Sequence, residues 1–195
     1  LDAVGDINQA MPFYQEAIEA LESNVAHDPL LAANLRNNLG MIYRDRHELE
    51  AAEAHYLKAL SVFEAHHGAC SEPVAAMHNN IGALYQAASH LDRALEMHMR
   101  ARDIRLKLTG PHSIDTGQSL GNIAAAYHGL GKSEEAAIYY LRALRALSNH
   151  QDSELFQITN ENFGVLIEQY PEVTTIKLTE ESRPKLQNAL MEMPL

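Results

Sequence analysis

One asparagine recurs along this chain of 195 residues at nearly constant spacing. The numbering differs by 42 from Asn38 to Asn80 and again from Asn80 to Asn122, and by 40 from Asn122 to Asn162. An asparagine amide offers a hydrogen-bond donor and an acceptor, so it can pair with the C=O and N–H groups of a peptide backbone. A column of these amides could hold an extended peptide by its main chain.

Other residues accompany this asparagine series. Further amide side chains lie close to it in sequence, at Asn34, Asn37, Asn79 and Gln118. One helical turn after each asparagine of the series stands an uncharged apolar residue: Met41, Ala83, Ala125 and Val165. Because helix interiors disfavour asparagine unless something rewards it, we favour contact with a ligand. The alternative is that these asparagines cap or bridge neighbouring helices.

The same period extends to other residue types, which must form the elements that position the asparagines. Three sets keep the period of 42: Tyr43, Tyr85 and Tyr127; Ala52, Ala94 and Ala136; and Tyr56, His98 and Tyr140. A fixed period between about 20 and 50 residues is typical of a solenoid built from one supersecondary unit. Apolar residues at helical spacing within each period predict helices.

These signals divide the chain into an array and a tail. The array is expected over residues 1–170, as a half repeat (1–25), three repeats (29–67, 71–108 and 112–148) and a terminal helix (152–170). Leu1 matches Tyr43 in register, so the sequence is expected to open in mid-repeat. The tail, 171–195, contains a candidate helix over 180–192 that either caps the array or occupies a groove. The half repeat and the tail each offer a route to self-association.

Large, small and aromatic residues at these offsets resemble the tetratricopeptide repeat, whose common form repeats at about 34 residues. The longer period, the paired asparagines and the connection Gly110-Pro111-His112 resemble the repeats of kinesin light chain. The resemblance implies an all-α, right-handed superhelical solenoid of antiparallel helix pairs. Its concave groove would be lined by the first helix of each pair, which would place the asparagine series in that groove.

One ligand class of such repeats is disfavoured by the residue before each asparagine. In relatives that clamp a C-terminal carboxylate, a lysine precedes the asparagine. Here this place holds Asn37, Asn79, Gly121 and Glu161. A basic series does recur on the second helices, at Lys58, Arg100 and Arg142. We interpret it as a solvated face rather than a contact for acidic peptides.

Composition narrows the function further. A net charge of −11 argues against nucleic-acid binding, which needs a basic surface. No run approaches the roughly 18 to 20 apolar residues of a membrane span. The single cysteine, Cys70, has no motif of a reactive thiol nearby, and the histidines lack metal-ligand spacing. We therefore expect a cytoplasmic protein that is not an enzyme and carries no cofactor or metal.

Together these patterns predict a scaffold or adaptor that binds a peptide or protein segment in the concave groove. The alternative is a peptide-sensing regulator whose output domain lies outside this sequence. Neither interpretation identifies the partner.

Overall fold

The computed structural model describes residues 4–23 and 27–173, which contain helices and no strand. The chain divides into two compact units, Leu1–His90 and Leu91–Leu195, called here the N-terminal and C-terminal units. The first contains α1 (Val4–Glu22), α2 (Pro29–Asp45), α3 (Leu49–His67) and α4 (Glu72–Ala87). The second contains α5 (Leu91–Thr109), α6 (Ile114–Gly129), α7 (Ser133–Ala146), α8 (Glu154–Gln169) and the 3₁₀ turn η1 (Pro171–Val173). The predicted all-α class is confirmed.

Local sequence explains where several helices begin and end. The side chains of Asp28, Ser113 and Ser153 accept hydrogen bonds from backbone N–H groups in the first turns of α2, α6 and α8. These bonds satisfy donors that a helix start leaves without an intrahelical partner. Gly68 follows α3 with a φ of 81°, a conformation that glycine adopts without strain. The turns are short, so successive helices within a unit run antiparallel.

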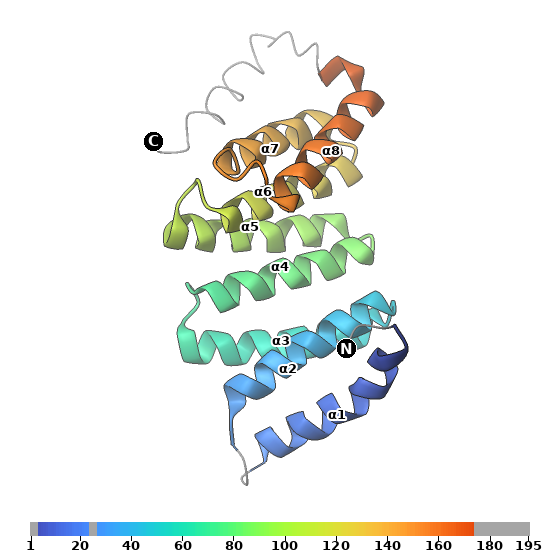
Figure 1. The fold of residues 1–195 in the computed structure, drawn as a ribbon, viewed down its shortest axis with the longest axis vertical. Helices are drawn as coiled ribbons and strands as arrows, with labels where there is room; N and C mark the ends of the chain where they lie inside the picture. The colour runs from blue at the N-terminus through green and yellow to red at the C-terminus, as the bar shows by residue number, and fades with distance from the viewer. Residues whose placement is uncertain (1–3, 24–26, 174–195) are drawn as a thin grey trace. The chain divides into compact units, whose positions relative to one another are not determined.

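In the N-terminal unit, each helix packs against the next one in sequence, and α2 also contacts α4 (Figure 1). The tightest seam joins α2 to α3. A Cβ atom added at Gly40 would lie 2.5 Å from Cε1 of Tyr56, whose side chain is fully buried. Glycine at this position therefore lets the two helices approach closely. On the other side of α2, Leu39 packs with Met11 and Ile18 of α1.

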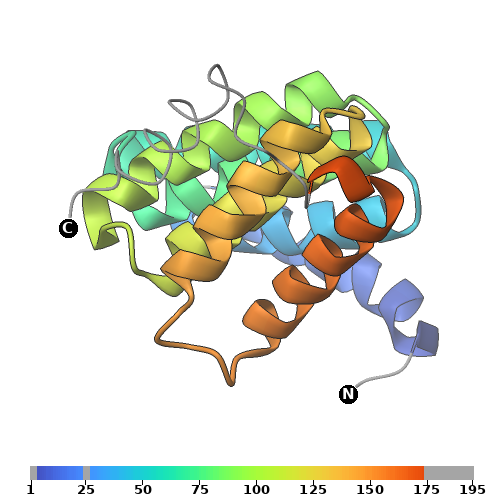
Figure 2. The ribbon, with the colours of Figure 1, turned by 90° about the horizontal axis from the view of Figure 1, so that it is seen from above.

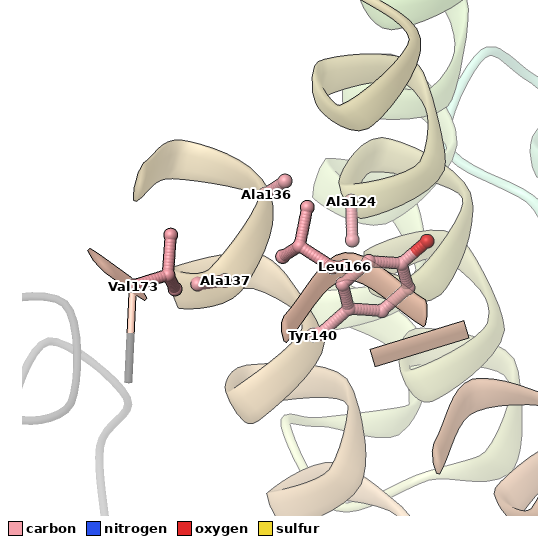
Figure 3. Packing of buried hydrophobic residues seen from close by; sticks show 6 residues of the cluster. All are labelled: Ala124, Ala136, Ala137, Tyr140, Leu166 and Val173. Atoms are coloured by element: carbon pink, nitrogen blue, oxygen red, sulfur yellow. The ribbon is translucent and has the colours of Figure 1, made fainter. Parts of the chain in front are cut away.

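The C-terminal unit repeats this arrangement. Helices α7 and α8 lie side by side, and α6 packs against both of them (Figure 2). The buried Tyr140 ring lies next to Leu166 and Ala124, and Val173 of η1 lies beside Ala137 (Figure 3). The 3₁₀ turn thus returns the chain to the core that α6, α7 and α8 share.

Two predictions concern residues outside the described part of the chain. They are the match of Leu1 with Tyr43 and the candidate helix over 180–192. Within the described ranges, no helix is both long and apolar enough to cross a bilayer.

Candidate functional site

The asparagine series begins on an exposed face of α2. Leu31, Asn34, Asn38 and Met41 share this face and are all exposed, Leu31 by 46% and Met41 by 39%. Asn34 donates a hydrogen bond to the backbone oxygen of Leu30 at 3.0 Å. The Asn38 side chain forms no hydrogen bond with the described residues. This face therefore combines an uncommitted amide with exposed apolar side chains.

On α4 the corresponding residues are less exposed. Nδ2 of Asn80 donates to Oδ1 of Asn37 at 2.8 Å, which links α4 to α2. The bridging alternative thus describes this pair, although the bond leaves Oδ1 of Asn80 and Nδ2 of Asn37 for another partner. Asn79 and Ala83 are half-buried, and Asn79 has a further contact of its own.

The C-terminal unit carries the series on α6 and α8. Asn162 is exposed on α8 and forms no hydrogen bond with the described residues, and the flanking Ile158 and Val165 are each 45% exposed. On α6 the predicted residues are half-buried: Gln118, Asn122 and Ala125. Each unit therefore has one first helix, α2 or α8, that exposes an asparagine and an apolar residue one turn later.

A buried arginine orients Gln118. Nη1 of Arg105, a residue that is 4% exposed, lies 3.0 Å from Oε1 of Gln118 and 3.1 Å from Oγ of Ser119. A guanidinium can only donate, so the amide oxygen of Gln118 must face Arg105 and its NH₂ group must face away. Arg105 is not among the residues that the sequence predicts for the site. The sequence does mark Arg105 as unusual, because the equivalent residues one repeat before and one repeat after it are the apolar Phe63 and Leu147.

The basic series on the second helices is engaged locally. Arg100 is exposed and pairs with Glu96, one turn earlier, at 2.7 Å. The guanidinium of Arg142 lies over the Tyr139 ring, 5.1 Å from its centroid. Lys58 is exposed. These contacts are typical of an exposed helix surface. They do not extend the asparagine faces, which are the exposed faces of the first helices that carry Asn38 and Asn162.

The strongest pKa shifts lie in the helix seams. Burial lowers the pKa of His98 to about 4, with a further contribution from the positive charge of Arg105. Burial raises the pKa of Tyr56 and that of Tyr140 to about 12. All three side chains occupy one register position, and in each of them removal from water favours the neutral form. Among the described residues, no group of three His, Cys, Asp or Glu side chains could hold a metal ion.

Comparison with known proteins agrees with this architecture. Two family models, both described as tetratricopeptide repeat, match residues 73–149 and 32–71. The crystal structure of BtubC (BKLC) from P. vanneervenii has a TM-score of 0.77 at 19% identity, covering 95% of this chain and 75% of that chain. No curated protein sequence matches.

A second similar structure has repeats of the same kind. It contains the nearly identical TPR-like repeats of a candidate kinesin light chain from Podosopora anserina, with a TM-score of 0.71 at 12% identity. The match covers 96% of this chain and 90% of the Podosopora anserina chain. A variant of the same protein gives the same TM-score at 13% identity. At these identities the likeness establishes a common fold.

Proposed function

This chain belongs to the tetratricopeptide repeat family, in its kinesin-light-chain-like subclass, and we propose that it binds an extended peptide along the asparagine faces of its first helices. Repeats of this family generally serve as scaffolds for protein–protein interactions. In this proposal the bound peptide lies in a concave groove. The protein acts as a cytoplasmic scaffold or adaptor and catalyses no reaction.

The observation that carries the proposal is the exposed pair of asparagine and apolar residue found in both units. Asn38 precedes Met41 on α2, and Asn162 precedes Val165 on α8. Asparagine in a helix interior costs about 0.7 kcal/mol relative to alanine. Neither asparagine recovers this cost through a hydrogen bond with the described residues. A bound peptide would supply the missing partners.

The pair suits a main-chain ligand for two reasons. The amide can donate to a peptide carbonyl and accept from a peptide N–H, so it recognises any extended sequence. The exposed side chains of Met41 and Val165 would gain from burial against apolar residues of the peptide, at about 25 cal/mol per Å² of apolar surface. The net charge of −11 would favour encounter with neutral or basic peptides over acidic ones.

Random-peptide phage display on the whole chain, followed by affinity measurement, tests the proposal. Peptides selected on the unmodified protein should bind the double variant Asn38→Ala, Asn162→Ala at least tenfold more weakly. The matched control is Asn160→Ala, at an exposed asparagine that lies near Asn162 in sequence but does not share its helix face. It should bind the same peptides with unchanged affinity.

Two results would contradict the proposal. One is that the double variant loses stability in urea unfolding but binds the selected peptides as before. The other is that display yields no peptide whose affinity depends on either asparagine.

A further inference from the structure

A buried charge fixes the orientation of the Gln118 amide. Nη1 of Arg105 lies 3.0 Å from Oε1 of Gln118, and it also donates to Oγ of Ser119 at 3.1 Å and to the backbone oxygen of Asp115 at 3.0 Å. A guanidinium has donors and no acceptor, so Oε1 of Gln118 is the amide atom that must face it. The NH₂ group of Gln118 therefore points away from Arg105 and keeps both of its hydrogens.

This NH₂ group is available to a ligand. Nε2 of Gln118 forms no hydrogen bond with the described residues, and Gln118 shares its face of α6 with Asn122 and Ala125, one and two turns later. The positive charge of Arg105 polarises the amide through the bond to Oε1, which makes Nε2 a stronger donor. This turn of α6 therefore presents a hydrogen-bond donor of fixed direction.

The equivalent amide of the N-terminal unit points the other way. Asn34 on α2 stands two repeats before Gln118, and the residue two repeats before Arg105 is the apolar Leu21 of α1. Leucine offers no donor for the amide oxygen. The NH₂ group of Asn34 turns to its own helix, where it donates to the backbone oxygen of Leu30 at 3.0 Å. A directed donor thus accompanies the arginine and is not a property of the repeat position itself.

Stability alone does not account for Arg105. The equivalent residues Phe63 and Leu147 are buried apolar side chains. Burying a guanidinium removes it from water, and a well-packed apolar side chain in place of a buried charged group is often equally stabilising or more so. What the arginine supplies, and an apolar residue cannot, is a donor directed at Oε1 of Gln118.

We propose that Arg105 is a positioning residue of the peptide site, which holds Gln118 so that its Nε2 donates to a main-chain carbonyl of the bound peptide. The inference rests on the proposed function, because α6 packs against α8, whose Asn162 is proposed to bind the same peptide. Arg105 is 4% exposed and therefore acts through Gln118. A carbonyl is the acceptor that every peptide carries, and the net charge of −11 disfavours a carboxylate in its place.

The first test is Gln118→Glu, measured with synthetic copies of peptides selected by phage display on the unmodified chain. The new carboxylate is held ionised beside Arg105, so it still accepts from the guanidinium but has no hydrogen to donate. Resistance to urea should be unchanged or higher, while the peptides should bind about tenfold more weakly because one hydrogen bond is lost. The control Gln151→Glu adds the same charge at an exposed glutamine in the turn between α7 and α8, and it should leave the affinity unchanged.

Two substitutions of Arg105 separate positioning from support of the fold. Arg105→Lys keeps a side chain that can only donate, so its affinity should stay within about threefold of that of the unmodified chain. Arg105→Met fills the seam without a donor and leaves the Gln118 amide free to turn, which should weaken binding about fivefold. In the Gln118→Ala background, Arg105→Met should weaken binding no further, because Arg105 acts through Gln118. A loss caused by general destabilisation would persist in that background.

Unchanged or tighter binding by Gln118→Glu would overturn the inference, because the ligand group at Gln118 would then not be an acceptor. An equal loss on Arg105→Met with and without Gln118 would overturn it as well. In both cases the proposed function stands if the double variant Asn38→Ala, Asn162→Ala still weakens binding. If selected peptides bind that double variant as before, the proposed function fails and this inference fails with it.

Discussion

The α2–α3 pair of the N-terminal unit and the helices of the C-terminal unit share one repeat register but fill it differently. Gly40 lies beneath the Tyr56 ring, whereas Gly164 meets no described atom at the same position. The place of Tyr56 on α3 is taken by His98 on α5. The repeat register thus determines which positions face each other. The side chain at the facing position determines how much each of them contributes to stability.

The seam between α5 and α6 shows how far such replacement can go. Arg105 takes a place that is apolar in the neighbouring repeats, and it is buried. A buried charge is tolerated only when hydrogen bonds replace its water. Here Nη1 donates to the Gln118 and Ser119 side chains and to the backbone oxygen of Asp115. The polar seam therefore also orients Gln118, a residue of the proposed binding face.

The largest expected difference in the free energy of unfolding is between substitutions at Gly40 and at Gly164. Gly40→Leu should lower the free energy of unfolding by about 3 kcal/mol or more, since the buried Tyr56 ring has no room to move. Gly164→Leu should change it by less than about 1 kcal/mol, because leucine is the better helix former and meets open space. Urea unfolding followed by circular dichroism measures both. Equal losses would show that the two positions do not differ as the geometry requires.

The second difference concerns pH. The pKa of His98 is lowered to about 4 in the folded chain, below its usual 6.5. The unfolded chain therefore binds a proton first as the pH falls, and His98 stabilises the fold above about pH 6.5 and loses this contribution towards pH 4. Between pH 7 and pH 5 the loss should be about 2 kcal/mol, at about 1.4 kcal/mol for each pH unit below 6.5.

His98→Tyr is the matched variant for this measurement, because tyrosine occupies the position in α3 and α7. Its unfolding free energy should lack the His98 contribution between pH 7 and pH 5, while carboxylate titration is common to both proteins. An identical pH dependence in the two proteins would place His98 in a hydrated environment.

The smallest difference separates two members of the basic series. Arg142→Ala removes a guanidinium from above the Tyr139 ring and should cost about 0.5 to 1 kcal/mol. Arg100→Ala removes an exposed pair with Glu96 and should cost no more than about 0.5 kcal/mol. Thermal unfolding in low and high salt distinguishes them, since only the exposed ion pair should weaken strongly with salt. The reverse order of costs would contradict this assignment.

The asparagine series was predicted from the sequence, but the exposure of its individual members was not. The sequence located Asn38, Asn80 and Asn162 on equivalent turns of first helices. It did not distinguish the exposed Asn38 and Asn162 from Asn80, whose amide bonds to Asn37 across two helices. That difference depends on which helix packs against each side chain, and the repeat period contains no information about this packing. Their role in binding stays a prediction.

The sequence by itself determined the helical class and the repeat family, because periodic small and aromatic residues can be buried together only when helices stack in register. Tertiary structure alone decided which members of each series are used by packing. It paired Arg105 with Gln118 and placed the Tyr56 ring against Gly40, whereas a Cβ added at Gly164 would meet no described atom within 4 Å. The physical reason is that burial and hydrogen-bond partners are properties of neighbouring helices, whose approach no single position in the period records.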